Sequence, residues 1–206
     1  MGFLLTIAAE SAYASLSFVP GNVISGDTIA GSLTADFTDV TGGVQLVITS
    51  NLAPGENLQA EKALYFNFNP SKVSVLSNLT FTLTGNTNFN QQATVSKSAD
   101  AYKADGDGSY DILFAYSNNA NAFAAGESQT YKITGTNIAA SDFLYQSVGG
   151  ANGSWFAAAH VLNTPGTSGS GWVGATVTPT PIPAAAWLLG SGLMGVLGLR
   201  RKANKG

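Results

Sequence analysis

The stretch Leu79-Thr80-Phe81-Thr82-Leu83-Thr84 decides the fold class of this 206-residue chain. Apolar and hydroxyl side chains alternate along it, and a period of two is that of a strand and not of a helix. This alternation is typical of an antiparallel strand with one face on a core and the other face in water. The stretch therefore predicts an all-β domain.

Short alternating or β-branched runs recur on both sides of this stretch, separated by clusters of Gly, Asn, Asp, Ser and Pro. Gly42-Gly43 favours a hairpin, and the run Asp111-Ile112-Leu113-Phe114 favours a central strand. Residues 58–63 favour one turn of helix at most. The spacing predicts a β-sandwich of jelly-roll or Ig-like type. The expected strands cover residues 29–40, 44–48, 63–68, 76–83, 93–97, 110–116, 129–135, 155–162 and 171–177.

The N-terminus has the pattern of a signal peptide. An apolar run over residues 3–9 is followed by Ala12-Tyr13-Ala14, whose small side chains fit a signal peptidase pocket. Cleavage before Ser15 would make residues 1–14 the signal peptide and residues 15–177 the ectodomain. The apolar run is short and interrupted by Glu10, so the alternative is an apolar first strand.

The C-terminus has the pattern of a membrane-spanning helix. Residues 182–199 carry no charge, and eighteen helical residues are just long enough to cross a hydrocarbon core of about 30 Å. Arg200-Arg201-Lys202 follow at once, which places the tail in the cytoplasm and the preceding domain outside. The alternative is a buried core helix, but this run has no amphipathic stripe to pack on a soluble core. We expect the helix over residues 184–199 and a basic tail over residues 200–206.

The whole C-terminal segment, residues 178–206, resembles the PEP-CTERM protein-sorting signal. The likeness rests on the order of a Pro motif, Trp187-Leu188-Leu189, Gly190-Ser191-Gly192, an apolar run and a basic stop. It is closest to the variant in which a Val-Pro-Leu-Pro-Ala type motif replaces Pro-Glu-Pro. The residues that stand for that motif are Thr180, Pro181, Ile182, Pro183 and Ala184.

The resemblance implies recognition by an exosortase, an integral-membrane cysteine transpeptidase-like enzyme of exopolysaccharide-producing Gram-negative bacteria. It implies removal of the helix at the inner membrane and transfer of the ectodomain to the cell surface or extracellular matrix. Stretches such as Leu64-Tyr65-Phe66-Asn67-Phe68 and Gly169-Ser170-Gly171-Trp172 are also similar to an ectodomain that recurs before such signals. No biochemical activity follows from that second likeness.

Composition narrows the functional classes. The chain has no Cys, which removes disulfides, thiolate chemistry and Cys-based zinc sites. Between Ser15 and Pro183, five lysines stand against eleven acidic residues, a net charge of −6. An acidic domain cannot bind nucleic acid through counterion release, so we expect no nucleic-acid partner.

One acidic loop raises the question of calcium. Asp105, Asp107 and Asp111 occupy positions 1, 3 and 7 of a loop, as at the start of a calcium-binding loop. An EF-hand would need Gly at position 6 and Glu at position 12, where Tyr110 and Tyr116 stand. Asp-Gly also forms hairpin turns, and the sequence favours that interpretation. We expect no obligatory cofactor, with calcium as the alternative.

Aromatic residues late in the chain raise the question of sugar binding. Tyr145, Trp155 and Trp172 are candidates for a platform of the kind found in carbohydrate-binding sandwiches, although such residues are more often core. His160 is the only histidine and has no recognisable nucleophile or orienting partner in sequence. The sequence predicts a non-enzymatic surface or biofilm-matrix protein that acts in exopolysaccharide. The alternatives are a carbohydrate-binding module and, more distantly, a secreted hydrolase.

Overall fold

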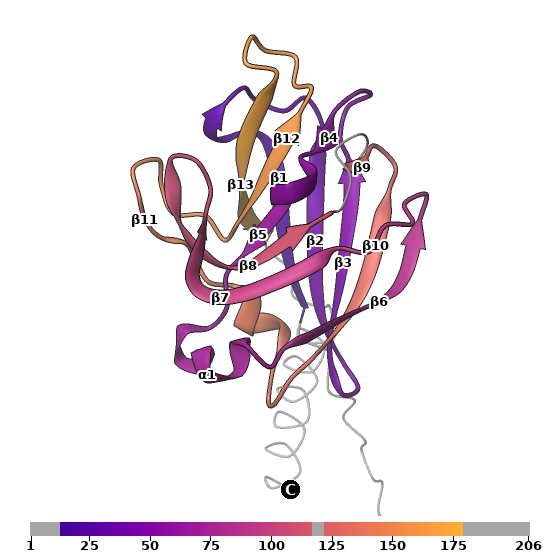
Figure 1. Cartoon of the computed structure of the whole chain (residues 1–206), viewed down its shortest axis with the longest axis vertical. Helices are drawn as coiled ribbons and strands as arrows, with labels where there is room; N and C mark the ends of the chain where they lie inside the picture. The colour runs from indigo at the N-terminus through magenta and orange to yellow at the C-terminus, as the bar shows by residue number, and fades with distance from the viewer. Residues whose placement is uncertain (1–12, 117–121, 179–206) are drawn as a thin grey trace, which may run out of the picture.

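The computed structural model describes residues 13–116 and 122–178 (Figure 1). The expected signal peptide up to residue 12, the sorting motif, the helix over residues 184–199 and the basic tail lie outside the described residues. Within the described ranges, no helix has both the length and the apolar character needed to cross a bilayer.

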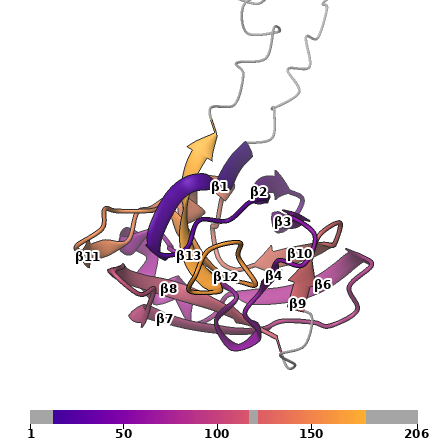
Figure 2. The same ribbon diagram turned by 90° about the horizontal axis from the view of Figure 1, so that it is seen from above.

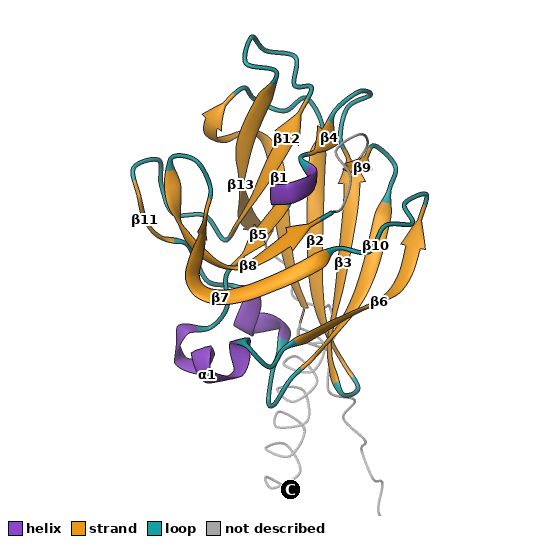
Figure 3. Cartoon of the chain, viewed as in Figure 1, coloured by secondary structure: helices purple, strands orange, loops and turns teal. Residues whose placement is uncertain are grey.

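Strands dominate the described chain, and its helical segments are single turns (Figure 3). These turns are η1 (Ala60–Lys62), η2 (Pro70–Lys72), α1 (Val73–Leu76) and η3 (Ala140–Phe143). The strands are β1 (Tyr13–Gly26), β2 (Ser32–Val40), β3 (Gly43–Asn51), β4 (Asn57–Leu58), β5 (Leu64–Phe66), β6 (Thr80–Thr87), β7 (Thr94–Lys103), β8 (Asp107–Ala115), β9 (Ala122–Ala124), β10 (Ser128–Thr134), β11 (Val148–Gly150), β12 (Ala157–Leu162) and β13 (Ser170–Thr178).

Ten of these strands form one hydrogen-bonded path, in the order β11-β8-β5-β12-β13-β1-β2-β3-β10-β6, with every pair antiparallel. Strand β7 pairs with β8. The sheet curls into a nearly closed barrel, so that β7 and β8 lie across from β1 and β2 (Figure 2). The prediction of an all-β domain is confirmed. The arrangement differs from two separate sandwich layers because hydrogen bonding continues from strand to strand around the curl.

The barrel interior is filled by a chain of aromatic rings that joins its facing walls. Phe37 on β2 meets Phe66 on β5 edge to face, with ring centroids 5.6 Å apart. Phe66 meets Phe114 on β8 at 5.5 Å, and Phe114 meets Tyr131 on β10 at 5.3 Å. All four side chains are buried. Edge-to-face pairs of this kind stabilise beyond the area they bury.

Side chains bridge the gap in the barrel between the β6 segment and strands β7 and β8. In the described residues, no ladder of strand hydrogen bonds joins β6 to β7 or β8. Phe81 on β6 instead packs edge to face on Phe114, with centroids 5.5 Å apart, and Lys97 on β7 donates to the carbonyl of Leu79. The alternation that marked this stretch in the sequence is present, since Phe81 and Leu83 turn toward the core while Thr80, Thr82 and Thr84 are exposed.

Each of the nine expected strands overlaps an observed one. The hairpin at Gly42-Gly43 is confirmed between β2 and β3, and β8 is central, as expected, because β5 and β7 flank it. The expected strand over residues 76–83 begins only at Thr80, because residues 73–76 form α1. Strand β1 has no counterpart among the expected strands. It begins at Tyr13, so cleavage before Ser15 would remove its first two residues, and Ala14 is buried.

Candidate functional site

The outer face of strands β5, β12 and β13 carries a second hydrophobic cluster outside the barrel. Residues directly opposed in an antiparallel pair share a face. Trp172 opposes His160, and Tyr65 opposes Ala158, which lies two positions from His160 on β12. These four side chains therefore share one face, while Ala157, Ala159 and Val161 point into the barrel core.

Aromatic rings on this outer face form a stack. The His160 imidazole lies flat on the Trp172 indole, with centroids 4.5 Å apart and planes 10° apart. Trp172 stacks in turn on Tyr65 at 5.2 Å, and Tyr65 on Tyr102 at 6.3 Å. Burial raises the pKa of Tyr65 to about 12, so its hydroxyl stays protonated at neutral pH. The stack fixes the position of the His160 ring on the outer face of the sheet.

A polar depression of about 530 Å³, here called the lysine pocket, opens beside this stack. Its walls come from β12 and β13, from the turn η1, and from the hairpin that joins β7 to β8. Cationic side chains, carboxylates and neutral hydrogen-bonding side chains line it, and the Trp172 indole forms an aromatic wall. The lining residues are Gln59, Lys62, Lys103, Ala104, Asp105, Gly106, Asp107, His160 and Trp172.

Three buried polar atoms of this lining lack a hydrogen-bond partner. They are Gln59 Oε1, Asp107 Oδ1 and His160 Nδ1. Among the described residues only two other buried side-chain atoms share this condition, Asn22 Nδ2 and Ser50 Oγ. Buried polar groups are almost always paired in folded proteins, because an unpaired one costs about 1–3 kcal/mol. Unsatisfied polar atoms are therefore concentrated at the lysine pocket.

The carboxylate of Asp107 is held from one side only. Tyr110 and Ser147 both donate to its Oδ2 atom, Ser147 at 2.9 Å, while Oδ1 has no partner. The Asp107 side chain is only 7% exposed. Burial, together with the bond to Asp107, raises the pKa of Tyr110, which keeps that hydroxyl a donor. The carboxylate is thus oriented, with one oxygen uncommitted.

The histidine of the pocket is held in its neutral form. Burial lowers the pKa of the His160 imidazole, and the positive charge of Lys62 lowers it further, while Asp105 acts in the opposite direction. A neutral imidazole has one nitrogen that accepts and one that donates. His160 therefore offers hydrogen bonds to a ligand without adding a charge. In the described part of the chain, no serine or other nucleophile bonds to it, as a catalytic base would require.

The three carboxylates that the sequence groups as a possible calcium loop have different hydrogen-bond partners and do not converge on one point. Asp105 is exposed and accepts a 3.3 Å bond from Ser25, while Asp107 binds Tyr110 and Ser147. Asp111 is buried and accepts from the backbone amides of Phe68 and Asp100, both at 2.8 Å. The described residues contain no group of three potential metal-binding side chains. Asp105-Gly106 forms the β7–β8 hairpin turn, as the sequence favours.

Of the three aromatic residues proposed from sequence as a sugar platform, Trp155 and Trp172 pack on the outer cluster, and Tyr145 lines a second pocket. Trp172 is only 7% exposed and packs as a core residue of the outer cluster. The sequence offers a core position as the alternative to a sugar-binding one. Trp155 packs on the same cluster, where its ring covers Gly174 so closely that a Cβ there would come within 2.1 Å of it. Tyr145 lines a second pocket, which contains neither tryptophan.

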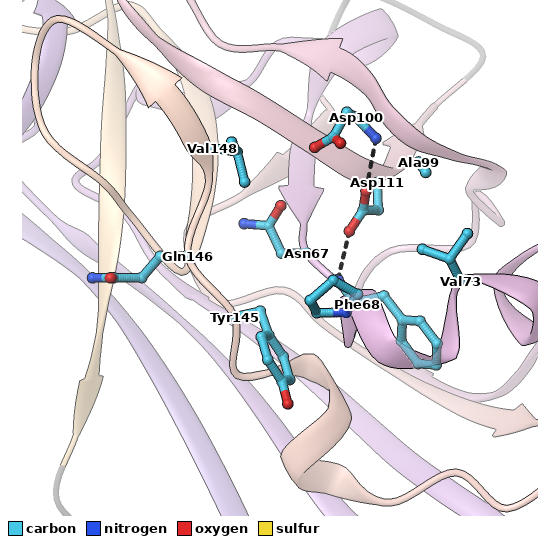
Figure 4. Close-up of a pocket in the computed structure, with 10 residues that line it drawn as sticks. Asn67, Phe68, Val73, Ala99, Asp100, Asp111, Tyr145, Gln146 and Val148 are labelled. Carbon is cyan, nitrogen blue, oxygen red and sulfur yellow. Dashed lines mark hydrogen bonds between the residues drawn. The ribbon is translucent and has the colours of Figure 1, made fainter.

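This second pocket, here called the apolar pocket, is a small hollow of about 90 Å³ (Figure 4). Val73 and Val148, two of the few large exposed hydrophobic side chains, stand at its rim and are 44% and 69% exposed. Asp111 also lines the hollow, but both of its oxygens are already bonded to backbone amides (Figure 4). The hollow therefore offers a ligand little besides apolar contact.

Sequence reasoning finds only part of the lysine pocket. Asp105, Asp107, His160 and Trp172 are all singled out by the sequence, yet they are assigned to separate candidate sites. Gln59, Lys62 and Lys103 are missed. The scarcity of lysine in this acidic domain is the one sequence feature that could have pointed to Lys62 and Lys103.

Comparisons with family models, with curated proteins and with solved structures give no match to this chain.

Proposed function

We propose that this chain is an exported bacterial protein whose C-terminal segment is a PEP-CTERM-like sorting signal. An exosortase at the inner membrane would recognise Thr180 to Ala184 after a single transmembrane helix over residues 184–199 has delivered that motif. Arg200, Arg201 and Lys202 would stop translocation at the cytoplasmic face. The processed domain would reside at the cell surface or in the extracellular matrix, with a non-enzymatic structural or adhesive role in exopolysaccharide.

The place where the folded domain ends supports this proposal. Strand β13 ends at Thr178, two residues before the Pro motif. It lies between β1 and β12 in the sheet, so the last described strand is paired on both sides before the motif begins. Pro181 and Pro183 cannot continue a strand ladder or a helix. A cut in this short segment would separate the domain from the membrane helix without breaking any strand.

The arrangement of the chain ends is also consistent with export. Ser15 near the start of β1 pairs with Thr178 at the end of β13, and the hydroxyls of Ser17 and Thr178 are 2.6 Å apart. Both ends of the domain therefore leave from the same end of the barrel (Figure 2). An N-terminal export signal and a C-terminal helix would reach one membrane surface without crossing the domain.

The test is mass spectrometry of surface and extracellular fractions from the native host and from a strain without its exosortase. We expect wild-type cells to yield a C-terminus between Thr180 and Ala184, and exosortase-deficient cells to retain peptides through Lys202. The double variant Pro181→Ala/Pro183→Ala should resemble the deletion, whereas the loop substitution Pro165→Ala should be processed normally. Equal recovery of peptides through Lys202 from both strains would leave a plain membrane anchor in place of a sorting signal.

A further inference from the structure

We propose that the lysine pocket binds an acidic saccharide, a uronic acid unit whose carboxylate meets Lys62 and Lys103 while its hydroxyls meet the unpaired acceptors. This inference rests on the pocket alone and holds whether or not the C-terminal segment is processed. It names a site and a ligand class that the sorting proposal does not supply.

The five lysines of the acidic domain differ in their hydrogen-bond partners. Three of the five are committed to protein acceptors, since Lys72 pairs with Asp142, Lys97 binds the carbonyl of Leu79, and Lys132 binds that of Thr41. Neither Lys62 nor Lys103 bonds to any group in the described part of the chain, and both line the lysine pocket. The two uncommitted lysines of the described domain thus line one pocket together with Asp105 and Asp107. This lining suits a ligand that carries an anionic group for the lysines and hydrogen-bond donors for the carboxylates.

The unpaired atoms of the lysine pocket require hydrogen-bond donors from a ligand. Gln59 Oε1 and Asp107 Oδ1 accept hydrogen bonds and cannot donate them, and the neutral His160 ring can also accept. A simple anion such as phosphate or sulfate offers these acceptors few or no donors. A ligand that satisfies the lining must bring hydroxyl groups together with its negative charge. A uronic acid unit carries both on one ring.

A metal cation fits the same lining poorly. Lys62 and Lys103 repel it, and only the two carboxylates of Asp105 and Asp107 are at hand. Asp107 is already oriented by Tyr110 and Ser147. The volume of about 530 Å³ lies within the range of small-molecule sites and far exceeds the space that one ion needs.

The pocket is also fixed before any ligand arrives. The His160 ring is set by its stack on Trp172. Asn152 holds the hairpin turn, because its backbone amide donates to the Gly106 carbonyl at 3.1 Å and its side-chain amide donates to the Ile24 carbonyl at 2.8 Å. Gly106 has a φ of +85°, and a Cβ there would come within 2.6 Å of the Asn152 side chain. A rigid lining loses little entropy on binding, which raises affinity for a matching ligand.

The test is affinity electrophoresis of the full chain in detergent, in gels that contain polygalacturonate or, for comparison, neutral dextran. EDTA is present throughout, so that calcium cannot bridge carboxylates. We expect retardation in polygalacturonate and none in dextran. The double variant Lys62→Gln/Lys103→Gln should bind roughly tenfold more weakly, since each exposed ion pair contributes modestly, and added salt should weaken the wild type in the same direction.

Matched variants separate the pocket from general charge. Lys103→Gln and Lys132→Gln remove the same charge, but only Lys103 lines the pocket, so only Lys103→Gln should reduce retardation. His160→Phe keeps a flat ring on Trp172 and removes both nitrogens, and we expect weaker binding with an unchanged circular dichroism spectrum. Equal effects of Lys103→Gln and Lys132→Gln, equal retardation in dextran, or no retardation of the folded wild type would each overturn the proposal.

Discussion

Glu56 shows what one buried side chain does for this barrel. Its carboxylate is 2% exposed and accepts from the backbone amides of Ala30, Gly31 and Ala53, at 2.7, 3.0 and 2.9 Å. These amides belong to the loop that enters β2 and to the turn that leaves β3. One side chain therefore satisfies three donors that no strand pairing reaches, and ties the two segments together.

Replacing this carboxylate should be costly. We expect Glu56→Gln to lower the free energy of unfolding by about 3 kcal/mol, because an amide satisfies the three donors poorly and buried unpaired donors are expensive. Urea denaturation followed by circular dichroism measures the change. Glu61→Gln removes the same charge at an exposed position and should shift stability by less than about 0.5 kcal/mol. Similar losses for both variants would contradict the role given to Glu56.

At the scale of secondary-structure elements, Asp142 joins two helical turns that lie far apart in sequence. Lys72 at the end of η2 donates to it at 2.7 Å, Asn69 at 2.8 Å, and the amide of Ala139 before η3 at 2.9 Å. Burial by itself would raise the pKa of Asp142. The bonds from Lys72, Asn69 and Ala139 outweigh burial and lower that pKa below its ordinary value of 3.8.

This pKa shift predicts how stability depends on pH. A carboxyl whose pKa is lower in the folded state contributes stability above its unfolded pKa, and that contribution is lost as pH falls through the folded value. We therefore expect the thermal midpoint of the wild type to fall as pH drops below about 3.8, and that fall to be shallower in Asp142→Asn. Glu61→Gln, at an exposed position, should keep the wild-type slope. Parallel profiles for Asp142→Asn and wild type would exclude this linkage.

Sequence patterns reveal the strands of this barrel but not its closure. Alternation locates β6, and Gly42-Gly43 locates the turn before β3, because both signals are local. Strand β1 escapes because Val19 to Asn22, with Pro20 and Gly21 among them, form a bulge that interrupts its alternation. The lysine pocket cannot be predicted from the sequence because its residues come from β12, β13, η1 and the β7–β8 hairpin. Only the pairing of these strands in the folded sheet brings them together.

At the scale of the whole molecule, β13 determines where the chain can be cut. It pairs with β1 from Ser15 to Gly26 and with β12 from Ala157 to Leu162, and so joins the two halves of the barrel. Its residue Ala175 is fully buried, whereas Thr178 is exposed. We therefore expect the C-terminal limit of the chain needed for folding to lie between Ala175 and the Pro motif.

Two truncations locate this boundary. A chain that ends at Thr178 keeps every strand pair of the described residues, and we expect its thermal midpoint to lie within about 2 °C of the full chain in the same detergent. A chain that ends at Val173 loses the buried Ala175 and the pairing of β1 with residues 175–178, which leaves strand edges and core side chains in water. It should lose cooperative unfolding by circular dichroism. If the Thr178 chain proved unfolded, the domain would depend on residues beyond β13, and removal of the C-terminal segment could not release an intact barrel. If the Val173 chain unfolded like the wild type, β13 would not be the strand that joins the two halves.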